Sequence, residues 1–356
     1  MLSLLAGLWA GLLRLGFDLP DIRPELANQH GPLMALGFLG TLISLERAVA
    51  LTRRWGYASP LCFGLGMLAT LLGWQILGGW LLIAGAALFI AIFIAVLRIQ
   101  LAFHGVIMGL GAVAALVAAI FWLDGRPPLL MAAWLAGFLV LTISGERLEL
   151  ARFVQLKSIP RMLFLGATAV FGAGLIIAIS DAAVGTRVIG VGLILLAAWL
   201  ARYDIARRTI RGKGLTRFMA ACLLAGYAWL TIAGIVWIVS TNAYGWSYDA
   251  KLHAVFLGFA MSMIFGHAAV IFPAVFRIAV PYHRIYWVHL VLLHIGLTIR
   301  LLGDAAEAQW AWQLGGVLNE TAILLFIAVT ATAAVRATRS RSAVTRARMA
   351  QREAAR

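Results

Sequence analysis

The chain has 356 residues, of which 63% are hydrophobic and 12% are charged, and its formal net charge is +15. A soluble domain needs a largely polar surface, which this composition cannot supply. The only two cysteines are Cys62 and Cys222, and the chain has no Walker loop and no dinucleotide-binding glycine pattern. The sequence therefore excludes a disulfide framework and nucleotide-driven work, and it indicates an integral membrane protein.

Apolar runs of about 17 to 25 residues recur along the chain, and each is long enough to cross a hydrocarbon core of ~30 Å. We therefore predict an all-α, polytopic membrane protein with about twelve transmembrane helices. In chain order the predicted spans are 1–17, 31–51, 58–77, 79–100, 104–123, 129–146, 160–180, 184–203, 216–240, 252–277, 284–302 and 311–335. We expect one transmembrane domain over 1–335 and a disordered basic tail over 336–356.

The first span is short enough to raise a signal peptide as an alternative. No small-residue cleavage site follows it, because the next residues read "RLGFDLPDIRPEL". We therefore expect span 1–17 to be a retained helix.

Lysine and arginine gather in alternate loops, for example in "RRTIRGKGLTR" (207–217) and in the tail, whereas the intervening loops carry the aspartates. This is the positive-inside pattern. It predicts that both termini lie in the cytoplasm and that the protein resides in a bacterial inner membrane. It also explains the basic balance without a nucleic-acid partner, since the partner of these residues is the lipid bilayer.

A motif returns in the second, sixth and tenth spans. "GFLGTLISLER" (37–47) and "GFLVLTISGER" (137–147) share seven of eleven positions, and "GFAMSMIFGH" (258–267) is a looser copy with His267 in place of the glutamate. A motif that recurs every fourth helix predicts three four-helix units with pseudo-threefold symmetry about the membrane normal. The alternative is chance similarity among helices rich in leucine and glycine.

The repeated Glu46–Arg47 and Glu146–Arg147 pairs lie where spans 2 and 6 reach the cytoplasmic side. Arginines at this depth extend to the interface, and the acids pair with them or with neighbouring helices. We expect a structural anchoring role, with proton uptake as the alternative.

All seven histidines lie in or beside predicted spans, where ionisable groups are costly and usually functional. His30 opens span 2 and His253 opens span 10, both from the outer side and at matched depth. Two imidazoles so placed are candidate axial ligands of a haem, which we expect to be b-type. Met34 faces the same way as His30, and Arg300, like Arg14, lies at the outer end of its span as a candidate partner for propionates. The alternative is that each histidine caps a helix and bonds interfacial water.

A second pair of histidines lies deeper. His267 follows His253 by fourteen residues, on nearly the same face and about 21 Å further along the helix. Span 11 brings His294 to a comparable depth, so His267 and His294 are the candidate ligands of copper or another metal. Alternatively, His267 bonds a carbonyl near Pro273 and His294 bonds Glu320, an acid within span 12 that is a candidate proton relay or second-shell group.

These features together resemble the catalytic-subunit fold of haem–copper oxidases. More closely, "HGPLMALGF" in span 2, "GYAWL" in span 9 and "LHAVFLGFAMSMIFG" in span 10 resemble the NnrS family, haem- and copper-containing membrane proteins of the nitric oxide response. The resemblance implies that His30 and His253 bind haem. Spans 6 and 7 carry no histidine, so the three-histidine copper site of respiratory oxidases is absent and a proton-pumping oxygen reductase is disfavoured.

The sequence thus predicts a membrane haem protein that binds nitric oxide or a related small ligand, or that passes single electrons from a donor. Filled axial positions favour electron transfer or sensing over catalysis. One alternative is a proton-coupled secondary transporter of a small solute, with the histidines and Glu320 along its path. Another is an accessory subunit of a larger complex.

Overall fold

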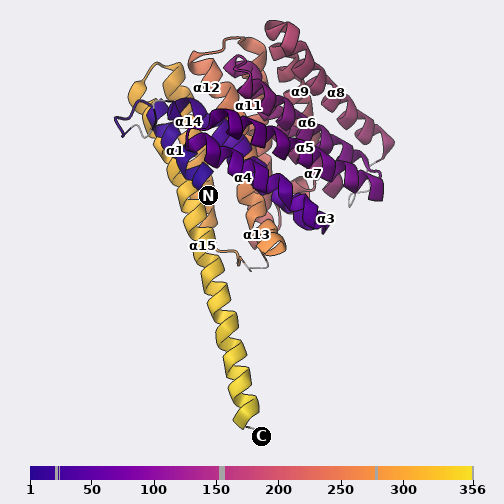
Figure 1. The fold of residues 1–356 in the computed structure, drawn as a ribbon, viewed down its shortest axis with the longest axis vertical. Coiled ribbons are helices and arrows are strands. Elements are labelled where there is room, and N and C mark those ends of the chain that lie inside the picture. The colour runs from indigo at the N-terminus through magenta and orange to yellow at the C-terminus, as the bar shows by residue number, and fades with distance from the viewer. Residues whose placement is uncertain (21–22, 24, 152–156, 277–279, 355–356) are drawn as a thin grey trace.

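The computed structural model describes residues 1–20, 23, 25–151, 157–276 and 280–354, and within these ranges it is helical without any strand. Helices stack side by side into one bundle, from which the last helix projects (Figure 1). The elements in chain order are α1 (Leu2–Arg14), η1 (Leu26–Gln29), α2 (His30–Pro32), η2 (Leu33–Gly40), α3 (Thr41–Leu51), η3 (Arg54–Tyr57), α4 (Ala58–Leu71), α5 (Gln75–Ile99), α6 (Phe103–Leu123), α7 (Pro128–Ala151), α8 (Ser158–Ser180), α9 (Ala182–Tyr203), α10 (Ala206–Thr209), α11 (Gly214–Val239), α12 (Gly245–His253), η5 (Ala254–Met261), α13 (Ser262–Phe276), α14 (Tyr286–Ala305) and α15 (Gln309–Ala354).

Ten of the helical segments among the described residues are long and apolar enough to cross a membrane. This confirms a polytopic membrane protein. The two remaining predicted spans are shorter than expected, because α1 has 13 residues and α4 has 14. At 1.5 Å per residue such helices reach about 20 Å, less than the ~30 Å hydrocarbon core.

Glycines in the left-handed region end both short helices. Gly16 follows α1 with φ +81°, and Gly73 follows α4 with φ +93°. After α4, Trp74 N–H donates to the carbonyl of Ala69, which closes the helix with a Schellman-type turn. After Gly73 the apolar sequence continues into the next helix, so hydropathy alone overestimates the length of α4.

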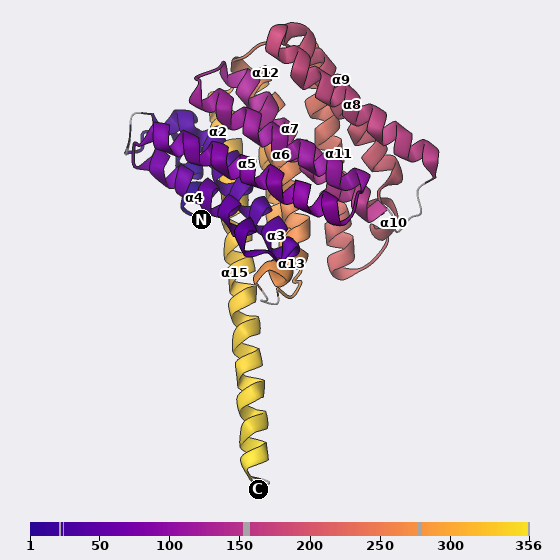
Figure 2. The ribbon, with the colours of Figure 1, turned by 45° about the vertical axis from the view of Figure 1, so that its right-hand side comes forward.

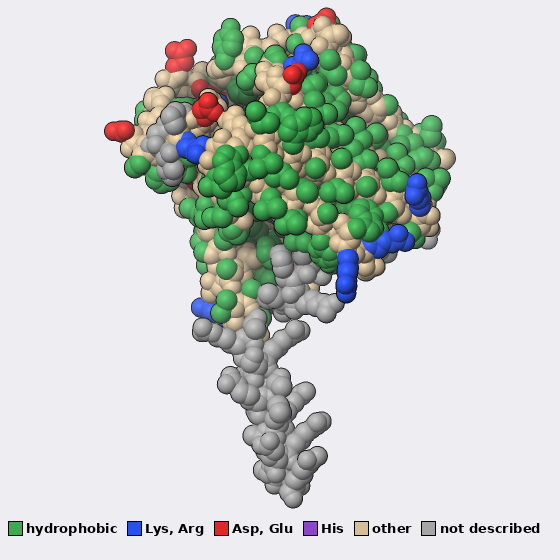
Figure 3. All heavy atoms as spheres, in the orientation of Figure 1, with side chains coloured by type: hydrophobic (Ala, Val, Ile, Leu, Met, Phe, Trp, Pro, Cys, Tyr) green, Lys and Arg blue, Asp and Glu red, His purple; other side chains and the backbone are tan. Residues whose placement is uncertain are grey.

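The helix α7 lies in the middle of the bundle. In its membrane-length window 83% of the residues are buried, against 33 to 56% for the other long helices. Figure 2 shows α6 beside it and α5 next to α6, with α8 and α9 at the right-hand margin. The visible outer face is mostly apolar, with charged side chains at its margins, as expected for a surface in contact with lipid (Figure 3).

Two elements, η2 and η5, are π-helical, and each belongs to one of the helices with the paired histidines. His30 begins the helix three residues before η2, and His253 directly precedes η5. A π-helical turn widens the helix locally and is found mostly at functional sites. The helix α7, which carries the motif copy at 137–147, is α-helical throughout.

The ends of the three repeated motifs meet. Arg47 donates to the carboxylate of Glu146 and lies 3.6 Å from Glu46. The neighbouring Arg147 reaches Nε2 of His267 at 3.0 Å. The three motifs are therefore joined by ion pairs and hydrogen bonds at one end of the bundle.

The arginine of the second motif is also part of a buried ion pair. Arg147 forms two hydrogen bonds with the carboxylate of Asp204, at 2.7 and 3.1 Å, and the two side chains are 3% and 2% exposed. This pair ties α7 to the segment that follows α9.

Candidate functional site

The rings of His30 and His253 lie next to one another on two different helices. Their centroids are 6.3 Å apart and the ring planes differ by 32°. The sequence analysis expected these two side chains at matched depth, and the structure brings them together.

One nitrogen of each ring is held by an acceptor. His30 Nδ1 lies 2.7 Å from the carbonyl oxygen of Gly7. His253 Nδ1 lies 3.0 Å from the carbonyl oxygen of Asp249 and 3.1 Å from its carboxylate. Because these oxygens only accept, Nδ1 carries the hydrogen in both rings, and Nε2 is left with a lone pair that can bind a metal.

A second ion pair orients His253. Arg300 donates two hydrogen bonds of 2.8 and 2.7 Å to the carboxylate of Asp249, the same carboxylate that contacts His253. The guanidinium, expected from sequence to bind a propionate, is thus engaged by Asp249. It holds the carboxylate that contacts Nδ1 of His253.

Both histidines line a cavity of about 350 Å³. The volume lies within the range of small-molecule and cofactor pockets. Its walls are mostly apolar and include Met34, Leu135 and Phe256, and the polar side chains that line it are Arg14, Asn28, Gln29, Arg126, Tyr248, Asp249, Arg300, Asn319 and Glu320. Of the residues predicted from sequence, His30, His253, Met34, Arg300 and Glu320 therefore share one cavity.

Two glycines of α1 allow this close packing. A Cβ at Gly7 would lie 2.6 Å from the sulfur of Met34, and one at Gly11 would lie 2.8 Å from a carboxylate oxygen of Glu320 and 3.2 Å from the ring of His30. The spacing of four residues is the small-xxx-small pattern of helix contacts in membranes. Glu320 consequently lies close to His30 and not against His294.

The other two histidines predicted as ligands have different partners. His294 accepts from the indole N–H of Trp229 at 2.9 Å, and its other nitrogen lies 3.3 Å from the hydroxyl of Ser262. Nδ1 of His267 lies 2.8 Å from the carbonyl oxygen of Met263, and its Nε2 lies 3.0 Å from the guanidinium of Arg147. All four nitrogens have hydrogen-bond partners within the protein, and the carbonyl that His267 bonds is that of Met263 and not one near Pro273.

Among the described residues, no group of three or more histidine, cysteine, aspartate or glutamate side chains is arranged to hold a metal ion. A bare ion between His30 and His253 would therefore have only two strong protein ligands, fewer than the four that tetrahedral ions take. A metal that brings its own equatorial ligands fits this pair better.

Sequence reasoning missed Asp249, Gly7 and Gly11. Asp249 stands four residues before His253, the spacing at which helical side chains meet. Gly7 and Gly11 form the small-residue pattern already noted. Both signals were present in the sequence.

Comparison with known proteins gives a family without an assigned activity. No curated protein and no solved structure matches the chain. Residues 1–335 match the model of the family described as "Domain of unknown function (DUF8744)". The chain therefore belongs to the DUF8744 family.

Proposed function

We propose that the chain is a membrane haem protein that passes single electrons, with a b-type haem held between His30 and His253. The observation that carries this proposal is the facing ring pair, 6.3 Å between centroids. Two metal–nitrogen bonds of about 2 Å, with about 1.2 Å from each nitrogen to its ring centroid, give about 6.4 Å for two imidazoles on one metal. The observed separation agrees with that value.

The surroundings of the pair support the same proposal. Both Nδ1–H groups are held by protein oxygens, which fixes the rings and raises the basicity of Nε2. Leucine, methionine and phenylalanine side chains provide apolar walls. Arg14 lies at the cavity and is the candidate partner of a propionate, since Arg300 is bonded to Asp249.

Iron bound by porphyrin supplies one-electron chemistry. The protein's own residues would set its reactivity: His30 and His253 would hold the group through Nε2, and the apolar walls would exclude water. Electron transfer would not require either histidine to leave the iron, whereas a small ligand would have to displace one of them. We therefore favour electron transfer over catalysis.

A role in the nitric oxide response is the finer form of this proposal. It rests on the resemblance of "HGPLMALGF" and "LHAVFLGFAMSMIFG" to the NnrS family. Nitric oxide would bind if one histidine is displaceable. Copper enters the proposal only through that resemblance.

We also propose twelve membrane crossings with both termini in the cytoplasm of a bacterial inner membrane, and pseudo-threefold repeats. The alternation of basic and acidic loops supports the orientation. The contacts of Arg47 with Glu146 and of Arg147 with His267 support the repeats, because they join equivalent ends of the three motifs. The disorder of 336–356 stays a prediction.

The alternative, a proton-coupled transporter of a small solute, is favoured by one observation. Glu320 and His30 lie close together in a cavity that Asp249 also lines. Uptake of a solute by proteoliposomes that depends on a proton gradient and is lost in Glu320→Gln would support it. A haem-loaded protein without such uptake would exclude it.

Carbon monoxide tests the electron-transfer proposal. With both axial positions filled by His30 and His253, we expect the visible spectrum of the reduced protein to stay unchanged when carbon monoxide is added. A shifted Soret band would mean that one position is open or readily vacated, and it would favour the nitric oxide role.

Asp249→Asn should weaken haem binding without unfolding the protein. The amide keeps the shape of the side chain but loses the charge that Arg300 and His253 contact. Substitution of an outer-shell partner of this kind costs about 10- to 100-fold in metal affinity. Haem titration of the apoprotein measures the loss, and Asp181→Asn, at the exposed N-cap of α9, is the control with unchanged affinity.

A further inference from the structure

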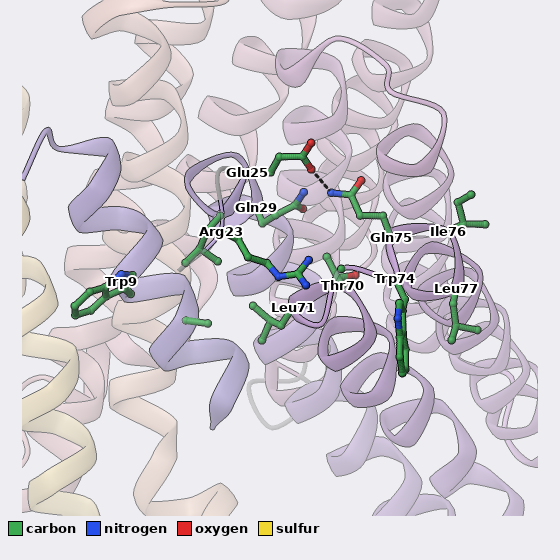
Figure 4. A pocket seen from close by; sticks show the side chains of 13 residues that line it. Trp9, Arg23, Glu25, Gln29, Thr70, Leu71, Trp74, Gln75, Ile76 and Leu77 are labelled. Carbon is green, nitrogen blue, oxygen red and sulfur yellow. Dashed lines mark hydrogen bonds between the residues drawn. The ribbon is translucent and has the colours of Figure 1, made fainter. Parts of the chain in front are cut away.

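A groove of about 1070 Å³ lies beside the cavity of the two histidines, between α1 and the turn that joins α4 to α5 (Figure 4). Its lining residues come from α1, from the segment before α2, and from the ends of α4 and α5. They are Ala6, Trp9, Arg23, Glu25, Leu26, Gln29, Thr70, Leu71, Gly73, Trp74, Gln75, Ile76 and Leu77.

One part of the groove is polar. Gln75 donates to the carboxylate of Glu25 at 2.6 Å (Figure 4). Arg23 donates to the carbonyl of Leu72 at 2.5 Å. The described residues of the lining include one guanidinium and one carboxylate, whose formal charges cancel. Amide and guanidinium N–H groups suit carbonyl acceptors, and the carboxylate suits a hydroxyl donor. These groups fit an uncharged ring that carries carbonyl and hydroxyl oxygens better than they fit a phosphate.

The other part is apolar and open. Trp74 is 60% exposed, Ile76 72% and Leu77 49%. In a bundle with a lipid-facing surface, such side chains at a helix end border the acyl region. A long apolar tail can therefore leave the groove into the membrane.

Gln29 connects this groove with the histidine cavity, because it lines both. Its side-chain oxygen accepts from the indole of Trp122 at 3.1 Å, and the next residue in the chain is His30. Gln29 therefore lies between a molecule bound in the groove and the cavity that contains His30.

From this arrangement we infer that the groove binds an isoprenoid quinol of the membrane, which is the electron donor of the protein. The inference rests on the proposed function for the electron acceptor, ferric iron between His30 and His253. Each quinol that becomes a quinone gives up two electrons and two protons. The two electrons would pass singly past Gln29 and reduce two ferric irons to ferrous iron, one in each of two chains, and the carboxylate of Glu25 would pass the two protons to water.

Binding of a short-chain quinone to haem-free protein tests the groove separately from the haem. We would titrate decyl-benzoquinone into the protein in phosphatidylcholine nanodiscs and follow the heat of binding. We expect saturable binding that Glu25→Gln weakens by about tenfold, because a hydrogen bond to a charged group is lost. Trp74→Phe should also weaken it, whereas Trp80→Phe, at 61% exposure on the same helix but outside the groove, should leave it unchanged.

Equal affinity in Glu25→Gln, Trp74→Phe and Trp80→Phe would overturn the inference. So would displacement of the quinone by phosphatidylglycerol, since the groove would then be a phospholipid site. Quinone binding by a protein that never takes up haem would leave the groove assigned and defeat the proposed function. Haem binding without quinone binding would support the proposed function and overturn the assignment of the groove.

Discussion

Replacing either His30 or His253 by alanine should reduce the haem iron of the purified protein to below about a tenth of the wild-type amount. Each substitution removes one of two axial ligands, and this effect should exceed that of outer-shell partners. The loss should be similar in the two variants because the rings face each other across one site. Iron analysis and the Soret absorbance measure it.

Two other histidines provide matched controls. His283 is exposed, and its Nδ1 accepts from the backbone N–H of Ile285. His294 is bonded to Trp229 and Ser262. His283→Ala and His294→Ala should keep their iron. If His294→Ala lost iron while His30→Ala kept it, the haem would lie elsewhere in the bundle.

Arg147→Met should destabilise the folded protein by about 3–5 kcal/mol, because it leaves the Asp204 carboxylate charged and almost fully buried. The substitution also removes the contact with His267. Denaturant unfolding in mild detergent, followed by circular dichroism, measures the change in the free energy of unfolding.

The double variant Arg147→Met with Asp204→Leu should regain most of the loss, since two apolar side chains of similar size often replace a buried pair without penalty. Arg126→Ala breaks the exposed pair with Asp124, whose side chains are 54% and 57% exposed, and should cost no more than about 1 kcal/mol. A loss of the same size in Arg147→Met and Arg126→Ala would show that the buried network contributes little to stability.

The sequence was sufficient for the parts of the fold that depend on composition and periodicity. Long apolar runs predicted the polytopic bundle, and the described residues contain ten helices of that kind. The lengths of α1 and α4 were wrong, because hydropathy does not register the left-handed glycines Gly16 and Gly73 that end them. Those glycines were visible in the sequence as stop signals.

The pair His30 and His253 was predicted from the depth of the two residues along their helices, and in the structure the ring centroids lie 6.3 Å apart. Depth alone does not determine which side of a helix meets which neighbour. For that reason the same argument put His267 beside His294, although Arg147 and Trp229 occupy their nitrogens. The π-helical turns of η2 and η5 also change the direction in which later side chains of each helix point. No residue pattern in the sequence indicated these turns.

The role of Arg300 shows a similar limit. Its position at a helix end indicated an anion partner, and the anion in the structure is Asp249 of a helix distant in the chain. Which of several acids an arginine meets depends on tertiary packing.

The most direct test of the central claim is the electron paramagnetic resonance spectrum of the oxidised wild-type protein, together with its iron content. We expect one haem iron per chain and a low-spin ferric signal, because two imidazoles give a strong ligand field. Iron-free protein after expression with ample haem, or a high-spin signal from iron with an open axial position, would contradict it.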